Sequence, residues 1–164
     1  MKYIILVSSI LITVYKFPNH KLEVKFENHI LNIDTSKYAI FKLEDDPSTF
    51  DKNCKPASLS NEEMNQIENI IDKEIAKINK EFKKSQHTKF NYVGNPKKYY
   101  KQIIAAINAK GEKVVWVNCL CTVSNEPDWK TRLIGMLDGG SCYFNCKINL
   151  KTNKLYDLMV NGVA

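Results

Sequence analysis

One segment constrains the fold more than any other, the stretch LSNEEMNQIENIIDKEIAKINKEFKK at residues 59–84. Large apolar residues recur in it at three- and four-residue spacing, which is the period of one face of an α-helix. These residues are Met64, Ile67, Ile71, Ile75, Ile78 and Phe82. Ser60, followed three residues later by Glu63, makes a capping box that predicts the start of this helix. An apolar face of this length needs a partner surface, and we expect a broad β-sheet.

A strand pattern replaces the helical one after residue 96. Residues 99–108 and 112–121 predict a hairpin around Gly111, and residues 129–137 and 141–150 predict a second around the turn 138–140. Residues 154–160 complete a third hairpin after the turn 151–153. Segments 22–34 and 38–44, before the helix, are also typical of strands. The predicted fold class is therefore α+β, with one long amphipathic helix packed on a four- to five-stranded antiparallel sheet.

The first residues, MKYIILVSSILITVYKF, have the pattern of an export signal. One lysine precedes a mostly apolar run from Tyr3 to Tyr15, which Lys16 closes. Such a run is too short to span a bilayer as a helix, and it fits the two regions of a secretory leader. No A-x-A cleavage pattern follows, and a buried first strand is the alternative. We expect a leader at residues 1–18, a single domain at 19–164, no transmembrane span, and an exported protein that is periplasmic, cell-surface or secreted.

The excess of positive charge is local. The net charge is +6, and residues 77–113 hold ten lysines with only Glu81 and Glu112 against them. Arg132 is the only arginine of the chain, whereas recognition of phosphates and bases favours the guanidinium group. We therefore expect a solvated lysine face and no nucleic-acid partner. Tyr92 and Tyr99 lie among these lysines, which keeps a stacking surface for single strands as the alternative.

Four of the five cysteines fall in the predicted strands, spaced C-x-C and C-x-x-x-C. Alternation along a strand places Cys119 and Cys121 on one apolar face, and it places Cys142 and Cys146 on another. In a meander of three hairpins these two strands lie about 9.6 Å apart, beyond disulfide reach. A disulfide between them therefore requires a different strand order. Cys54, in the loop before the helix, is the remaining disulfide candidate.

These cysteine spacings differ from those of known metal and redox sites. Structural zinc sites use tight turns such as C-x-x-C, and thioredoxin-like centres place C-x-x-C at the start of a helix. The histidines, His20, His29 and His87, are far apart in the sequence. We therefore expect buried thiols, with a disulfide left open, and neither a metal nor a cofactor.

Motifs of catalysis are absent from the sequence, which contains no H-x-x-x-H, G-x-S-x-G, P-loop or G-x-G-x-x-G pattern. We name no catalytic residue, and an enzyme is the less favoured class. Polar residues among the apolar strand positions are the candidate binding site. They are Gln102, Asn118, Tyr143 and Asn145. If they face inward they need hydrogen-bond partners and can form a small binding site, and the alternative is the solvated face of the sheet.

The strings VWVNC (115–119) and DGGSCYF (138–144) resemble those of small, uncharacterised, leader-bearing bacterial proteins, a resemblance that implies no activity. A looser likeness is to cystatins, whose antiparallel sheet wraps one helix. QIIAAIN (102–108) resembles their Q-x-V-x-G segment, and PDW (127–129) resembles their Pro-Trp hairpin. Ala106 replaces the glycine, which puts the inhibitor role in doubt.

The function that we expect is that of an exported domain that binds an unknown protein or a small ligand without evident catalysis. Two alternatives come from other classes. One is a small enzyme with its site in the polar strand cluster, and the other is a lysine-rich module that binds nucleic acid.

Overall fold

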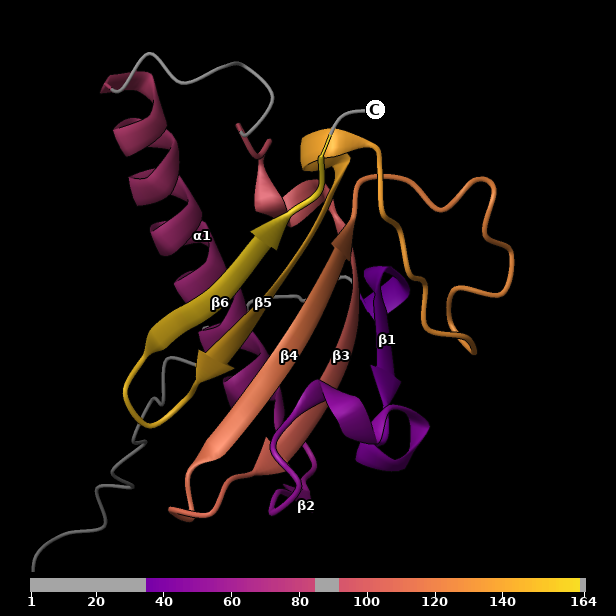
Figure 1. Ribbon diagram of the computed structural model, residues 1–164, viewed down its shortest axis with the longest axis vertical. Helices are drawn as coiled ribbons and strands as arrows, with labels where there is room; N and C mark the ends of the chain where they lie inside the picture. Colours follow the sequence, from indigo (N-terminus) through magenta and orange to yellow (C-terminus); the bar gives the residue numbers. More distant parts are fainter. Residues whose placement is uncertain (1–34, 85–91, 163–164) are drawn as a thin grey trace, which may run out of the picture. The chain divides into compact units, whose positions relative to one another are not determined.

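The computed structural model describes residues 35–84 and 92–162. Within these residues one α-helix packs on one face of a six-stranded, mostly antiparallel sheet (Figure 1), so the α+β prediction is confirmed. The predicted leader at residues 1–18 and the candidate strand at 22–34 lie outside the described residues.

The sheet is built around four antiparallel strands that follow one another along the chain. They are β3 (Tyr100–Ile107), β4 (Lys113–Leu120), β5 (Tyr143–Asn149) and β6 (Lys154–Val160). Two features differ from the prediction. The sheet has six strands, because the short β2 (Lys55–Pro56) also pairs with β3. The edge strand β1 (Tyr38–Phe41) runs parallel to β3, since the helix lies between them in the chain.

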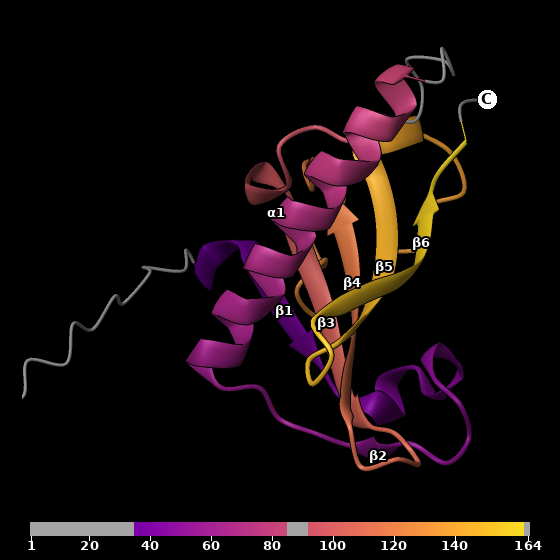
Figure 2. The ribbon, with the colours of Figure 1, turned by 90° about the vertical axis from the view of Figure 1, so that its left-hand side faces the viewer.

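Helix α1 (Asn61–Lys84) crosses one face of the sheet (Figure 2). The capping box is confirmed: the Ser60 amide donates to Glu63 Oε2 at 2.9 Å, and the Glu63 amide donates to Ser60 Oγ at 3.2 Å. Ile67, Ile71 and Ile75 are buried against the sheet residues of this face. Met64, Ile78 and Phe82 are only partly buried, whereas Asn79, one residue off the predicted stripe, is buried.

The predicted hairpin at residues 129–150 is wrong. Strand β4 pairs directly with β5, and residues 121–142 between them form a long irregular connection, which we call the long loop. Trp129 and Ile134 of this loop are buried against the sheet face opposite α1, which we call the second face. This face is apolar in its own right, and Phe50 of the segment before the helix helps to cover it. The loop's apolar residues therefore anchor irregular backbone rather than alternate along a strand.

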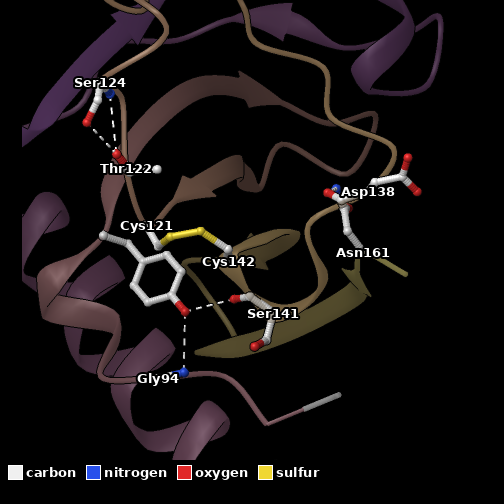
Figure 3. Close-up of a disulfide and its surroundings, with 9 residues drawn as sticks. Gly94, Cys121, Thr122, Ser124, Asp138, Ser141, Cys142 and Asn161 are labelled. Carbon is white, nitrogen blue, oxygen red and sulfur yellow. Dashed lines mark hydrogen bonds between the residues drawn. A yellow bond between two sulfur atoms is a disulfide. The ribbon is translucent and has the colours of Figure 1, made fainter. Parts of the chain in front are cut away.

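A disulfide between Cys121 and Cys142 closes the long loop at its base (Figure 3). The Cα atoms are 4.9 Å apart, because β4 and β5 are neighbours in the sheet. Cys119 and Cys146 are free and fully buried, as predicted for core positions. Cys121 is exposed and Cys142 is half-buried, so the core prediction is wrong for this pair, which lies just beyond the strand ends. Cys54 is free and partly buried.

Candidate functional site

The polar residues predicted from the strands lie together on the second face of the sheet. Gln102 pairs with Asn118 across β3 and β4, and Asn118 pairs with Asn145 across β4 and β5. Tyr143 lies two residues from Asn145 on the same side of β5. Gln102 and Asn118 are buried, and Tyr143 and Asn145 are half-buried.

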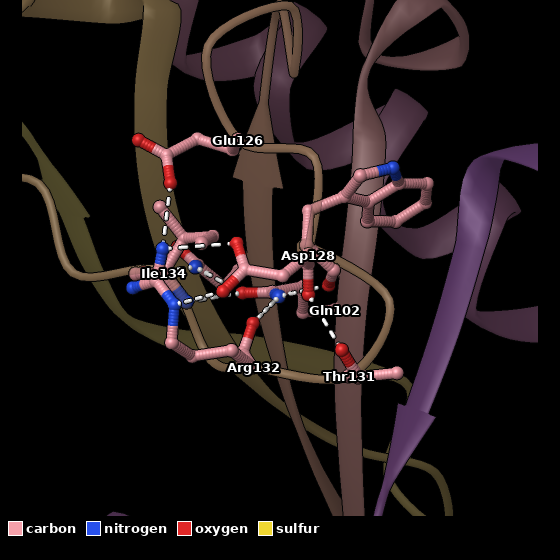
Figure 4. Close-up of polar contacts among 8 residues, drawn as sticks. Gln102, Glu126, Asp128, Thr131, Arg132 and Ile134 are labelled. Carbon is pink, nitrogen blue, oxygen red and sulfur yellow. Dashed lines mark hydrogen bonds and ion pairs between the residues drawn. The ribbon is translucent and has the colours of Figure 1, made fainter.

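The Gln102 amide uses all four of its hydrogen-bonding positions within the fold (Figure 4). Its Nε2 donates to the carbonyls of Trp129 at 2.6 Å and Arg132 at 2.7 Å. Its Oε1 accepts from the Ile134 amide at 2.9 Å and from Asn118 Nδ2 at 3.1 Å. A primary amide has two donor hydrogens and two acceptor lone pairs, so Gln102 has no group left for a ligand.

Asn118 adds a second contact between the sheet and the long loop, and Arg132 makes ion pairs within the loop itself. Asn118 Nδ2 donates to the Ile134 carbonyl at 2.8 Å as well as to Gln102. Arg132 donates to both carboxylate oxygens of Asp128 and to Glu126 (Figure 4). The Arg132 guanidinium lowers the pKa of the Asp128 carboxyl through these hydrogen bonds. Gln102 and Asn118 of the polar strand cluster therefore fasten the long loop to the sheet.

A different place offers room for a ligand. A cavity of about 560 Å³ lies between the second half of α1 and residues 92–97, and we call it the helix-side cavity. Its lining combines apolar, amide and charged side chains. The lining residues are Asp72, Ile75, Ala76, Asn79, Lys80, Lys83, Tyr92, Val93, Gly94, Asn95, Pro96 and Lys97. None of the four residues predicted from the strand cluster is among them.

The wall opposite α1 is held by hydrogen bonds from three directions. Asn79 Nδ2 donates to the Val93 carbonyl at 2.8 Å, and the Val93 amide donates back to Asn79 Oδ1 at 3.1 Å. The Tyr99 hydroxyl accepts from the Gly94 amide at 3.3 Å and donates to the Ser141 carbonyl at 2.8 Å (Figure 3). The Asn95 side chain accepts from the Lys97 amide at 3.0 Å and caps the turn η5 (Pro96–Lys98). These hydrogen bonds hold residues 93–97 in place beside the cavity.

Charged groups on the cavity lining are mostly positive. Lys97 Nζ pairs with Asp72 Oδ2 at 3.1 Å, which neutralises the acid of the lining. Lys83 Nζ lies 5.5 Å from the centre of the Tyr92 ring, within cation–π distance. Among the described residues no carboxylate pairs with Lys80 or Lys83. Within the part of the chain that the structure describes, these two ammonium groups can pair with a ligand anion.

Lys101 binds the backbone of the lining residue Pro96. Because Lys101 is buried, the prediction of a solvated lysine face is wrong for this residue. Its side chain is 1 % exposed. Its Nζ donates to the Pro96 carbonyl at 2.9 Å and pairs with Glu68 Oε1 of α1 at 3.2 Å. Lys101 points to the same, helix-facing side of β3 as Ile103 and Ala105, because alternate residues of a strand share a face. This spacing is the signal in the sequence that indicates burial of Lys101.

A second, smaller cavity of about 150 Å³ lies beside Cys54 and is also lined by Asp51, Lys147 and Tyr156. Burial and the neighbouring Asp51 raise the pKa of the Cys54 thiol, so the thiol stays protonated at neutral pH. A protonated thiol is a poor nucleophile. Within residues 35–84 and 92–162 no three His, Cys, Asp or Glu side chains gather as metal ligands would, and all three histidines lie outside these ranges.

No helix of the described residues is both long enough and apolar enough to cross a membrane. Comparison of the chain with protein-family models, curated proteins and solved structures finds no match in any of the three. The resemblances to leader-bearing bacterial proteins and to cystatins therefore stay predictions.

The helix-side cavity is the part of the candidate site that sequence reasoning missed. Its walls come from α1 and from residues 92–97, which are separated in the sequence, and neither segment carries a recognisable ligand-binding motif. One signal does exist in the sequence. Asn79 lies inside an otherwise apolar helix face, and a buried amide there needs a backbone partner from another segment.

Proposed function

We propose that the chain is an exported, non-catalytic binding domain that takes a small ligand in the helix-side cavity. The observation that carries the proposal is the cavity itself. Its volume of about 560 Å³ lies within the range of ligand pockets, roughly 300–1,000 Å³. Apolar side chains and a few convergent polar groups line it, and hydrogen bonds hold its walls in place.

Export is supported by two independent features. The first residues have the composition of a secretory leader. The disulfide between Cys121 and Cys142 is a bond that persists in oxidising compartments and is rare in reducing ones. A periplasmic, cell-surface or secreted location fits both features.

The two alternative functions have less support from the geometry. An enzyme with its site in the polar strand cluster could not use Gln102, because the Gln102 amide is fully hydrogen-bonded under the long loop. A lysine-rich nucleic-acid module loses two of its predicted contacts. Lys101 is buried with Glu68, and Lys113 pairs with Glu63 at 2.6 Å.

Export is tested by the intact mass of the protein from its native host, alkylated once before and once after reduction. We expect a mass that lacks roughly the first 15–20 residues, as for a cleaved secretory leader, and two cysteines that become reactive only after reduction. A full-length mass with five reactive thiols would contradict export.

Ligand binding is tested with a fluorescent organic sulfonate, 1-anilinonaphthalene-8-sulfonate, as the probe. Ala76 is an exposed helix residue on the cavity lining, so Ala76→Trp fills the cavity without disturbing the core. Asn69→Trp places the same side chain on an exposed helix position outside the lining. We expect the wild type and Asn69→Trp to bind the probe alike and Ala76→Trp to lose it, while circular dichroism shows all three folded. Probe binding that survives Ala76→Trp would place the binding site elsewhere.

A further inference from the structure

We infer that the helix-side cavity selects amphiphilic anions, that is, ligands with a carboxylate or phosphate group on an apolar body. The inference rests on the proposed function and names its ligand class. It is drawn from the way in which charge and apolar surface are divided over the lining.

The charge of the lining favours an anion. Three lysines and one aspartate line the cavity, which leaves two positive charges in excess. Lys97 is occupied by Asp72 at 3.1 Å, whereas Lys80 and Lys83 have no carboxylate partner among the described residues. A concave surface with charge of one sign concentrates counter-ions more strongly than a flat one does.

These lysines do more than compensate the end of the helix. Lys83 and Lys84 lie in the last turn of α1, where cations stabilise the helix dipole. Lys80 lies a turn earlier, and Lys97 comes from the separate segment η5. Helix-end compensation does not require lysines from two elements around one cavity.

The apolar part of the lining requires more than a bare inorganic ion. Ile75, Ala76, Val93 and Pro96 contribute apolar side chains, and the Tyr92 ring, 45 % exposed, lies on the same lining. A phosphate ion alone would leave this surface wet. A ligand with an apolar body removes this surface from water, which favours binding in proportion to the apolar area that it covers.

The use of lysine rather than arginine indicates how selective the site is. Lysine presents a compact charge without the planar fork that recognises carboxylate or phosphate by two parallel hydrogen bonds. We therefore expect the cavity to distinguish the sign of the ligand's charge strongly and the identity of the anionic group weakly.

The test compares two probes that share one aromatic skeleton and differ by the sulfonate group, 1-anilinonaphthalene-8-sulfonate and the uncharged N-phenyl-1-naphthylamine. It also compares two double variants of equal charge on the same helix. Lys80→Gln/Lys83→Gln removes the two lining lysines that have no carboxylate partner among the described residues, and Lys73→Gln/Lys77→Gln removes exposed lysines outside the lining. We expect the first variant to weaken sulfonate binding about tenfold and the second to leave it within about twofold, because only close charges act strongly in salt. Binding of the uncharged probe stays the same in both variants.

Displacement of the sulfonate identifies the source of the anion. Octanoate and octyl phosphate are expected to compete, and octyltrimethylammonium is not. Competition by vesicles of phosphatidylglycerol, at concentrations where octanoate has no effect, would assign the same chemistry to a membrane headgroup.

Two results would overturn the inference in distinguishable ways. If both probes bind equally, Lys80→Gln/Lys83→Gln changes neither, and Ala76→Trp abolishes both, the cavity binds apolar ligands and only the anion selectivity is wrong. If Ala76→Trp leaves both probes bound, the proposed function fails together with the inference.

Discussion

Lys101 is buried to a degree that is rare for lysine, because it connects three parts of the fold. Its Nζ contacts Glu68 of α1, the Pro96 carbonyl of η5 and, at 5.5 Å, the ring of Tyr38 at the start of β1. Removing one partner of such a pair leaves the other charge buried without compensation, which is the costly outcome.

We therefore expect Lys101→Met to lower the free energy of unfolding by about 3–5 kcal/mol, as for other broken buried pairs. Lys101→Met/Glu68→Leu removes both charges and recovers part of that loss. Urea denaturation measures both, with the exposed Lys110→Met as a control that changes the free energy by less than about 0.5 kcal/mol. A double variant no more stable than the single one would show that the charges are not coupled.

Cys146 makes stability depend on pH in the alkaline range. Burial raises the pKa of its thiol from 9.0 to about 12. Above pH 9 the unfolded chain loses this proton while the folded chain keeps it, so the folded state binds more protons and stability falls as pH rises. Below pH 9 both states are protonated and the contribution is constant.

The wild type is thus expected to lose about 1.4 kcal/mol per pH unit more than Cys146→Ala between pH 9 and about 12. Urea denaturation across this range measures the difference, and the titration of lysines cancels because both proteins share it. Parallel pH profiles would show that the buried thiol ionises as easily as a free one.

At the scale of elements, the long loop depends on attachments at three places. The disulfide closes its base, Gln102 and Asn118 hold its middle, and Asn161 donates to the carbonyls of Met136 at 2.6 Å and Asp138 at 3.1 Å near its end. These attachments allow irregular backbone to cover an apolar sheet face, a task that more often falls to a second helix.

Opening the loop should expose the sheet. We expect Cys121→Ser/Cys142→Ser to lower the free energy of unfolding by about 3 kcal/mol, the chain-entropy value for a loop of this length. Reduction of the wild type should shift the fluorescence of the buried Trp129 to longer wavelength. Dithiothreitol should leave the double variant unchanged, and a shift there would trace the effect to something other than the disulfide.

Across the fold, the sequence predicts the features that depend on local patterns and misses those that depend on distant contacts. The helix and the strands β3 to β6 carry periodic patterns over seven or more residues, and all five were predicted. The parallel pairing of β1 with β3 was not predicted. The four residues of β1 are apolar, and a short apolar segment does not indicate which strand it pairs with.

The candidate site could be predicted least. The sequence singled out Gln102 and Asn118 as polar residues inside strands but left open whether they face inward or toward solvent; both are buried, and their partners include backbone groups of the long loop. Every residue has a backbone carbonyl, so the amino-acid sequence does not indicate which carbonyl will accept a hydrogen bond. The helix-side cavity is likewise a space between segments, and a pattern along one segment does not predict it.

The parallel contact between β1 and β3 has a consequence for the order of events during synthesis. Tyr38 of β1 lies opposite Lys101 of β3. Strand β1 is therefore synthesised more than sixty residues before the strand with which it pairs. Within the meander, β3–β4 and β5–β6 close through short turns and β4–β5 closes across the long loop at residues 121–142, and all three separations are shorter than that between β1 and β3. We expect pulsed hydrogen exchange during refolding to protect the amides of β4 and β5 before those of β1, and simultaneous protection would exclude this order. A chain whose first strand pairs last has an incomplete sheet, with the β1 edge of β3 open, until the strands of the meander have paired.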